Sequence, residues 1–254
     1  MSTYVLVGGA WLGGWCWRDV ARSLRARGHD VHPVTLTGLG ERVHLARPDT
    51  DLETHIADVV NLLDYEDLAG VVLAGHSYAG SVVTGVADRR PGRLTQLVYL
   101  DTIPLGDGQA VVNLFSSDAR EQVERQVKEL GEGWRWPLPP FEELGKTSSL
   151  VGLDGGRLAL FRAKATPQPF RTFTQPLRLG HPLGGAYGRA AIICTAGGLT
   201  ISALRQLVSS GNPLFQVFGA PDWSFHELPA GHWPMLSAPD ALADLLHAAG
   251  VGRA

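Results

Sequence analysis

The stretch Val71-Val72-Leu73-Ala74-Gly75-His76-Ser77-Tyr78-Ala79-Gly80 decides the fold of this chain of 254 residues. Its apolar first half, Val71 to Ala74, predicts a buried strand, and its small last residues open a helix predicted over Gly80 to Arg89. Ser77 falls on the sharp turn between them, where small neighbours avoid a clash across the turn. Such a turn lifts the serine hydroxyl clear of the sheet, so Ser77 is a candidate nucleophile.

This turn departs in one place from the G-x-S-x-G form in which it is usually written. Gly75 and Ser77 match that form, but Ala79 takes the position of the last glycine and Gly80 follows one place later. Alanine is the mildest replacement for glycine that still carries a side chain. The motif alone leaves a second interpretation open, in which Ser77 is an ordinary serine in a strand–helix turn.

Outward from this turn, short apolar runs alternate with amphipathic stretches along the chain. Strands are predicted at Tyr4–Val7, Val31–Leu36, Val71–Ala74, Leu94–Leu100, Ala191–Thr195 and Phe225–Leu228. Helices are predicted at Trp15–Arg27, Asp51–Tyr65, Gly80–Arg89, Asp118–Leu130 and Pro239–Ala249. This alternation indicates an α/β fold with a mostly parallel, doubly wound sheet and helices on both of its faces.

The regular pattern stops from about Pro104 to Gly188, where aromatic residues, proline and glycine become frequent. We therefore predict a single core formed by residues 1–103 and 189–254, interrupted by an inserted cap at residues 104–188. Because open α/β sheets bind ligands at the carboxyl ends of their strands, the cap would cover the site. Its aromatic residues indicate an apolar or aromatic substrate, or else only the packing of the cap itself: Trp134, Trp136, Phe141, Phe161, Phe170 and Phe173.

The charge balance argues against some classes of protein. Lys and Arg together number 22 and Asp and Glu 25, which gives a net charge of −3. Nucleic-acid-binding proteins usually carry a clear basic excess, and so do proteins that bind anionic membrane surfaces. The expected partner is therefore a small-molecule substrate, with no nucleic acid and no membrane, and homodimer formation stays open.

No signal for export or membrane insertion is apparent in the sequence. The N-terminus has no basic segment before a long apolar run, and no run reaches the roughly 18 apolar residues that a membrane-spanning helix needs. Cys16 and Cys194 lie far apart and form no C-x-x-C motif, so we expect two buried thiols in a reducing compartment. These features predict a cytoplasmic protein.

A serine is a weak nucleophile at neutral pH and needs an adjacent base, which is most often a histidine. Of the nine histidines, His232 lies in a loop expected between the last strand and the last helix, next to Trp233. His76 precedes the serine and is expected to shape the pocket, and His55 is expected to make a structural contact. The remaining histidines are interpreted as surface or packing residues.

The first strand leads into a glycine-rich loop, Gly8-Gly9-Ala10-Trp11-Leu12-Gly13-Gly14. The loop matches neither the dinucleotide-binding G-x-G-x-x-G pattern nor the phosphate-binding P-loop, so no cofactor is expected, and no metal site is expected. In a serine hydrolase this loop supplies one backbone N–H of the oxyanion hole, and the residue after the serine supplies the other. That assigns the two N–H groups to Ala10 and Tyr78, with Gly9 and Trp11 lining the pocket beside them.

Taken in order along the chain, these motifs resemble the α/β-hydrolase superfamily, specifically the branch of plant hydroxynitrile lyases, plant methylesterases and their bacterial relatives. The resemblance implies the α/β-hydrolase fold, and it covers nearly the whole core. It leaves the reaction open, because this branch contains both ester hydrolases and carbon–carbon lyases. The segments that carry it, besides the serine turn, are Gly9–Trp11, Trp15–Trp17, Leu36–Arg42, Thr54–Val59 and Gly231–His232.

The chain departs from the family pattern at the acid of the catalytic triad. Relatives carry this acid just after the penultimate strand, but here Cys194-Thr195-Ala196-Gly197-Gly198-Leu199-Thr200 contains no carboxylate. A further departure is Gly8, which takes the place of a histidine. Asp101 ends the strand after the serine strand, and neighbouring strands lie about 4.8 Å apart, so its carboxylate could reach His232.

Two alternatives to Asp101 as the acid stay open. Asp222 and Glu227 are closer to His232 in sequence, but Glu227 falls inside a predicted strand and Asp222 before it. Asp101 could also be a purely structural aspartate, in which case Ser77 and His232 would act as a dyad. The separation between the Asp101 carboxylate and His232 Nδ1 decides whether Asp101 can orient the base.

The sequence therefore predicts a serine hydrolase that cleaves an ester, thioester or lactone of a small apolar or aromatic substrate through an acyl-enzyme, with Ser77, His232 and Asp101 as the catalytic residues. One alternative is a lyase or cyclase in which Ser77 and His232 form an acid–base pair without acylation. Another is a ligand-binding protein without catalytic activity. The predicted pocket is lined by Gly9, Trp11, His76, Trp134, Trp136 and Trp233.

Overall fold

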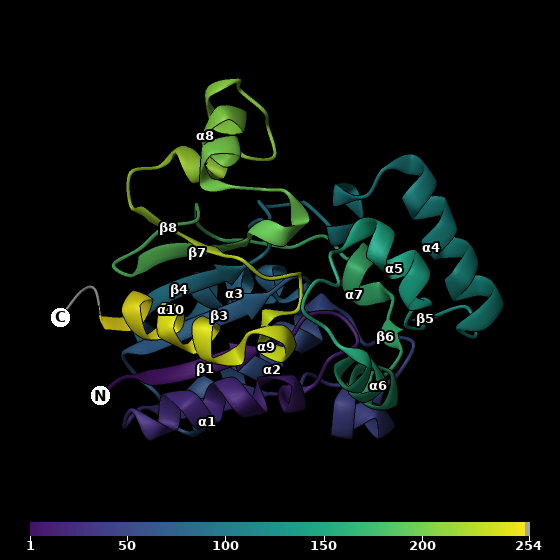
Figure 1. Ribbon diagram of the computed structural model, residues 1–254, viewed down its shortest axis with the longest axis horizontal. Helices are drawn as coiled ribbons and strands as arrows, with labels where there is room; N and C mark the ends of the chain where they lie inside the picture. The colour runs from purple at the N-terminus through teal and green to yellow at the C-terminus, as the bar shows by residue number, and fades with distance from the viewer. Residues whose placement is uncertain (252–254) are drawn as a thin grey trace.

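Six parallel strands form the central sheet of the computed structural model, which describes residues 1–251 (Figure 1). The strands lie in the order β2-β1-β3-β4-β7-β8, so the chain starts near the middle and is wound in both directions. This confirms the predicted doubly wound arrangement. The strands are β1 (Thr3–Val7), β2 (Asp30–Val34), β3 (Val71–His76), β4 (Leu94–Leu100), β7 (Gly188–Cys194) and β8 (Trp223–Leu228).

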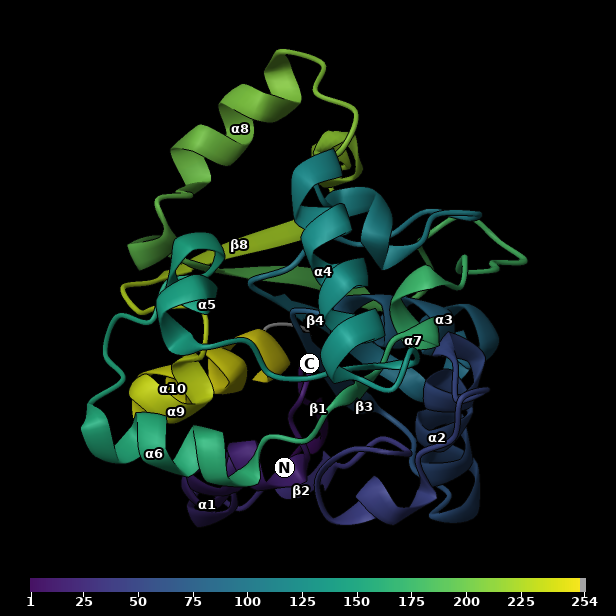
Figure 2. The ribbon, with the colours of Figure 1, turned by 90° about the vertical axis from the view of Figure 1, so that its right-hand side faces the viewer.

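Helices cover both faces of the sheet (Figures 1 and 2). Helices α1 (Arg18–Ala26) and α10 (Pro239–Val251) pack together on one face, and α2 (Leu52–Tyr65) and α3 (Ala79–Arg89) on the other. All six residues of β3 are buried between these layers, which explains why its sequence is apolar without alternation. The core of the protein therefore surrounds the strand that leads to Ser77.

Local signals explain where several of these elements begin. The Asp51 side chain accepts a hydrogen bond from Thr54 N at 2.9 Å, and the Thr54 hydroxyl accepts one from Asp51 N, so a capping box starts α2. Pro33 lies within β2, where it costs no ladder bond on one side because β2 is an edge strand. The capping box thus defines where α2 begins, and the edge position of β2 explains why a proline is accepted within that strand.

Some predicted boundaries and elements were wrong. The segment predicted as one helix from Trp15 is a 3₁₀ turn at Gly14–Trp17 followed by α1, and the second strand ends at Val34 rather than Leu36. Helix α8 (Ile201–Ser209) was not predicted, and neither was the short α9 (Pro234–Ser237). Helix α8 lies beyond the β8 edge of the sheet and buries only Leu204, although its apolar residues recur at helical spacing.

The segment at residues 104–188 contains small elements that lie at the carboxyl ends of the sheet strands (Figures 1 and 2). The predicted helix in this segment is present as α4, and the others were not foreseen. Strand β7 begins at Gly188, the last residue of the predicted insertion. The elements are α4 (Ser117–Leu130), β5 (Arg135–Trp136), α5 (Phe141–Thr147), α6 (Gly155–Lys164), β6 (Gln168–Pro169) and α7 (Arg171–Thr174), with β5 and β6 paired antiparallel.

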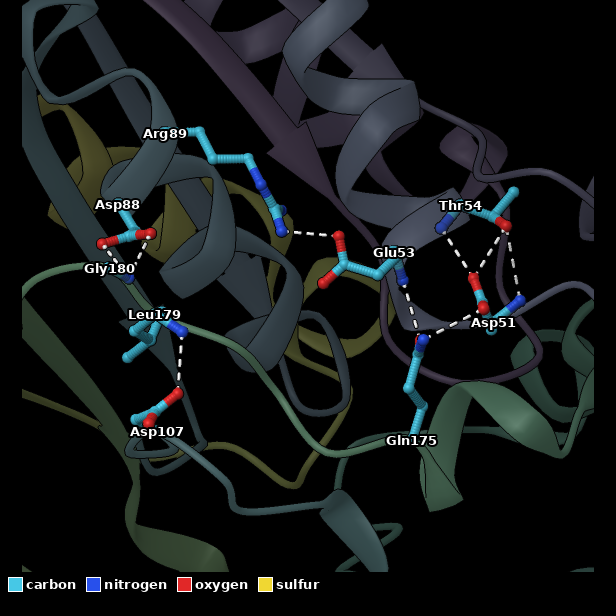
Figure 3. Close-up of polar contacts among 9 residues, drawn as sticks. All are labelled: Asp51, Glu53, Thr54, Asp88, Arg89, Asp107, Gln175, Leu179 and Gly180. Carbon is cyan, nitrogen blue, oxygen red and sulfur yellow. Dashed lines mark hydrogen bonds and ion pairs between the residues drawn. The ribbon is translucent and has the colours of Figure 1, made fainter.

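The returning end of this segment is tied to the core by side chains of α2 and α3 (Figure 3). Gln175 accepts a hydrogen bond from Glu53 N at 3.0 Å and donates one to Asp51 Oδ2 at 3.0 Å. Further along, Gly180 N donates to Asp88 Oδ2 at 3.0 Å. These bonds satisfy backbone groups at the start of α2 and hold the segment against the core at two points.

Two further expectations concern cysteines and membranes. Cys16 and Cys194 are both free and buried, as predicted, and burial raises the pKa of each thiol, so neither is a reactive thiolate. Within residues 1–251, no helix combines the length and the apolar character needed to cross a membrane.

Candidate active site

Ser77 lies on a strained turn between β3 and α3. Its φ angle is 51°, in the left-handed region that residues other than glycine rarely adopt. The turn depends on close approaches of the backbone: a Cβ on Gly75 would lie 2.6 Å from Ala79 O, and one on Gly80 would lie 2.7 Å from Thr102 Cγ2. The second required glycine is therefore Gly80, which explains why Ala79 is tolerated one position earlier.

His232 lies within hydrogen-bonding distance of this serine. Its Nε2 is 2.9 Å from Ser77 Oγ. The loop that carries it is held by the inserted segment, because His232 N donates to Ser149 O at 2.8 Å. Gly231 is needed for this approach, since a Cβ there would lie 2.5 Å from Ser149 O. The inserted segment thus positions the base as well as covering the site.

His76 also contacts the loop that carries His232. Its Nε2–H donates to the His232 carbonyl at 2.6 Å, and the two rings lie 4.8 Å apart. The ring is fully buried, and burial lowers the pKa of His76 well below its usual value, so it stays neutral. Its Nδ1 has no hydrogen-bond partner among the described residues and faces Gly9, where a Cβ would lie 2.7 Å away.

Asp101 meets the geometric condition set for the acid. Its Oδ2 lies 2.6 Å from His232 Nδ1, and its Oδ1 accepts a hydrogen bond from Cys194 N at 3.0 Å. Asp101 has a φ angle of 48°, a second strained residue beside Ser77. Cys194, the last residue of β7, therefore supplies an amide donor that orients the Asp101 carboxylate.

The alternative acids lie elsewhere in the structure. Asp222 pairs with the buried Arg189, whose Nε donates to Asp222 Oδ2 at 2.6 Å. Glu227 accepts a hydrogen bond from Ile201 N at 2.7 Å, at the start of α8. Neither carboxylate is in contact with His232, so the chain brings only Asp101 to Nδ1 of that ring among the described residues.

The two residues whose amides are assigned to the oxyanion hole lie at the cavity that contains Ser77. Both Ala10 and Tyr78 line this cavity, and neither N–H donates to another group of residues 1–251. Tyr78 N lies at the start of α3, a helix of 11 residues, whose aligned peptide dipoles favour negative charge at that end. One free donor at a helix start and a second in the loop after β1 suit an oxygen that becomes negatively charged.

The loop that carries Ala10 is locked in place by the inserted segment. The next amide, Trp11 N, donates to Gln168 Oε1 at 3.1 Å, and Trp11 Nε1 donates to the Trp136 carbonyl at 3.0 Å. Trp11 has a φ angle of 64°, and its own carbonyl accepts from Thr166 N at 3.1 Å. These bonds engage the Trp11 amide and fix the backbone next to Ala10, whose own N–H makes no hydrogen bond within residues 1–251.

A buried network holds the Tyr78 side chain. His55 Nε2–H donates to the Thr37 carbonyl at 2.8 Å, so its Nδ1 accepts from the Tyr78 hydroxyl at 2.8 Å. Burial lowers the pKa of His55 to about 4, which keeps this acceptor unprotonated. The Tyr78 ring stacks on Phe173 with 5.0 Å between centroids. His55 therefore makes the structural contact expected for it.

A cavity of about 630 Å³ opens above Ser77, within the size range of small-molecule sites. Of the residues predicted to line it, Trp11, His76, Trp136 and Trp233 do so. Gly9 does not, because it lies behind the turn against His76 and Ser77.

Trp134 does not line the cavity either, contrary to the prediction from the sequence. Its ring packs instead beneath the guanidinium of Arg135, at 4.7 Å from the ring centre, and its carbonyl accepts a hydrogen bond from Phe170 N at 2.8 Å. Trp136, two residues later, is buried and forms a T-shaped pair with Trp11 at 4.6 Å. Of these two tryptophans, only Trp136 contributes to the pocket.

The other aromatic residues of the inserted segment divide between the two roles considered for them. Phe173 lines the cavity, whereas Phe161 is fully buried and packs against Phe141 and Trp233. Several lining residues were not predicted, because their positions depend on how α4, α5 and the chain that leads into α4 pack over the sheet, which no local pattern encodes. They include Leu105, Val111, Leu114, Phe115, Gln122, Val123, Gln126, Glu143 and Leu144.

Comparison with known proteins identifies the family of this chain. Residues 4–245 match the model of the alpha/beta hydrolase family. A carbendazim hydrolyzing esterase from Nocardioides sp. (strain SG-4G) is 34% identical over 258 residues, which cover 98% of this chain and 100% of that protein. A putative chloroplastic methylesterase 12 from Arabidopsis thaliana is 26% identical, over 97% of this chain and 71% of its own length.

Solved structures show the same fold. An extracellular alpha/beta-hydrolase from a Paenibacillus species, which shares structural and functional homology with tobacco salicylic acid binding protein 2, superposes with a TM-score of 0.82. It is 24% identical and is matched over 99% of this chain and 100% of its own. The sheet, the serine turn and the full-length match agree. The chain therefore belongs to the alpha/beta hydrolase family, in its methylesterase-like branch.

Proposed function

We propose that this carboxylic ester hydrolase cleaves its substrates through an acyl-enzyme formed on Ser77, with His232 as the general base and Asp101 as the group that orients it. The observation that carries this proposal is one continuous chain of contacts. Ser77 Oγ lies 2.9 Å from His232 Nε2, and His232 Nδ1 lies 2.6 Å from Asp101 Oδ2. An aspartate at Nδ1 fixes that nitrogen as the donor, which leaves Nε2 free to accept the serine proton.

The reaction begins when His232 takes the Ser77 proton and Oγ attacks the ester carbonyl carbon. The carbonyl oxygen becomes negatively charged and accepts hydrogen bonds from the amides of Ala10 and Tyr78. His232 then gives its proton to the leaving alcohol, and the acyl group stays on Ser77. A water molecule, deprotonated by His232, attacks the acyl-enzyme and releases the carboxylic acid.

The walls of the cavity support a small apolar or aromatic ester as substrate. Rings of Trp11, Trp136, Phe115 and Phe173 surround a space of about 630 Å³ above the serine. Such walls stabilise apolar groups by removing their surface from water, at roughly 25 cal/mol for each Å². Thioesters and lactones share the reactive carbonyl and stay within the proposed range.

Labelling with a fluorophosphonate tests this proposal. We expect one covalent adduct on Ser77, detected by mass spectrometry, and none on Ser77→Ala. The same substitution should lower kcat for a p-nitrophenyl ester by about 10⁴-fold or more, since the nucleophile acts together with its base. Turnover without any adduct would favour the lyase or cyclase alternative, and a function unaffected by Ser77→Ala would favour the non-catalytic one.

A further inference from the structure

The inserted segment presents to the cavity a carboxylate that the proposed mechanism does not use. Glu143 of α5 lines the same cavity as Ser77, together with Gln122 and Gln126 of α4. The Nε2 groups of Gln122 and Gln126 donate to Glu143 Oε2 at 3.3 and 3.1 Å. Two donors on one oxygen hold the carboxylate in a defined orientation.

The orientation of the Gln126 side chain is set by Trp136, one of the aromatic residues that line the cavity. The buried Trp136 donates its indole N–H to Gln126 Oε1 at 2.9 Å. Because an indole nitrogen only donates, the oxygen of the Gln126 carboxamide must face Trp136 and its NH₂ group must face Glu143. Both donors reach Oε2, so Glu143 Oε1 stays without a partner among residues 1–251.

The charges that line the cavity are acidic. Asp101 and Glu143 are the carboxylates among the lining residues, and no lysine or arginine of residues 1–251 lines the cavity or pairs with Glu143. Asp101 is engaged by His232 at 2.6 Å. Glu143 is therefore the lining carboxylate with accepting capacity left, and a substrate with its own distal carboxylate would be repelled.

We propose that Glu143 is a specificity-determining residue that accepts a hydrogen bond from an N–H group of the substrate. The preferred substrates are then apolar or aromatic esters whose end remote from the reacting carbonyl carries an amine or a heteroaromatic N–H. The inference rests on the proposed function for the position of the ester bond at Ser77. The contact with Glu143 changes the affinity for the substrate, so it can be measured without turnover.

The test compares matched substrates in matched variants. The substrates are methyl benzoates with para-aminoalkyl chains of increasing length, each paired with its alkyl counterpart of the same shape. For the best-fitting length, kcat/KM of the wild type should be about tenfold higher for the amine, since hydrogen bonds to charged groups are the stronger ones. Glu143→Gln should bring that ratio close to one, mainly through a higher KM for the amine. Glu142→Gln, an exposed neighbour outside the cavity lining, is the control and should keep the wild-type ratio.

Binding measurements separate this inference from the proposed function. Calorimetry with Ser77→Ala should give a lower Kd for the amine than for its alkyl pair, and Ser77→Ala combined with Glu143→Gln should give equal values. Such a preference without turnover of any ester by the wild type would support recognition at Glu143 and overturn the proposed function. Equal Kd values in Ser77→Ala, or an amine preference that survives Glu143→Gln, would overturn the inference even if the esters are hydrolysed.

Discussion

Ser77 and two residues near it adopt backbone conformations that residues other than glycine rarely take. Ser77, Asp101 and Trp11 have φ angles of 51°, 48° and 64°. Each such residue costs of the order of 1–3 kcal/mol and persists only where its surroundings fix it. All three residues line the cavity, so the strain lies where Ser77, Asp101 and the loop after β1 come together.

At the scale of a single residue, Asp101→Asn isolates the role of the acid. The carboxamide oxygen of the introduced asparagine can still accept from Cys194 N, and asparagine tolerates positive φ, so the fold should hold. Its NH₂ group, however, would face His232 Nδ1 and force that nitrogen to accept. Nε2 then carries the proton and cannot take one from Ser77, so we expect kcat to fall by about 10⁴-fold.

Steady-state kinetics and thermal unfolding check this prediction together. Tm should change by no more than a few degrees, in line with an unchanged set of backbone contacts around residue 101. Retention of more than a tenth of the wild-type kcat by Asp101→Asn would show that Ser77 and His232 work as a dyad.

At the scale of elements, the short strand β6 controls the loop after β1. Gln168 is fully buried and bridges two partners, accepting from Trp11 N at 3.1 Å and donating to Thr172 Oγ1 at 2.8 Å. Gln168→Leu would leave Trp11 N buried without a partner, which costs about 1–3 kcal/mol, whereas the Thr172 hydroxyl would keep its bond to the Pro169 carbonyl. The backbone at Trp11 would then relax, and the orientation of the neighbouring Ala10 amide would change.

We expect Gln168→Leu to lower kcat at least tenfold, with a smaller change in KM, because an oxyanion donor acts mainly on the transition state. The free energy of unfolding, measured in urea, should fall as well. The control is Gln206→Leu, which makes the same change on the exposed surface of α8. If Gln168→Leu lowers the free energy of unfolding but leaves kcat unchanged, the loop after β1 does not contribute to catalysis in this way.

The packing of the elements also shows which residues around the cavity a local sequence pattern can predict and which it cannot. The hydrophobic run of β3 and the small residues after Ser77 specify their own turn. The spacing of neighbouring strands made Asp101 a candidate partner of His232, but a structural aspartate stayed open until the contact at 2.6 Å was seen. Glu143 and Gln126 could not be predicted, because they meet only where α4 and α5 pack together. Trp134 and Trp136 are equally aromatic in sequence, and only the docking of β5 decides which of them faces the cavity.

At the scale of the whole molecule, buried histidines link stability to pH. Burial is the largest cause that lowers the pKa of four histidines, so the folded protein keeps these rings neutral. Unfolding exposes the rings to water, where they take up protons below about pH 6.5. The unfolded state therefore gains stability relative to the folded state as the pH falls below that value. The four residues are His29, His55, His76 and His226.

His55 sets the scale of this effect, since burial lowers its pKa to about 4. Between pH 6.5 and 5 the unfolded state alone binds this proton, so His55 by itself removes about 2 kcal/mol from the free energy of unfolding. Urea unfolding at a series of pH values should show a steep loss in this range, above the range in which buried or paired aspartates such as Asp88 titrate. His55→Gln can still donate to the Thr37 carbonyl but takes up no proton. Its free energy of unfolding should therefore fall less steeply with pH, by the contribution of about one proton. A slope identical to that of the wild type would mean that His55 is already protonated in the folded protein, and that its contact with Tyr78 is not the neutral one the geometry requires.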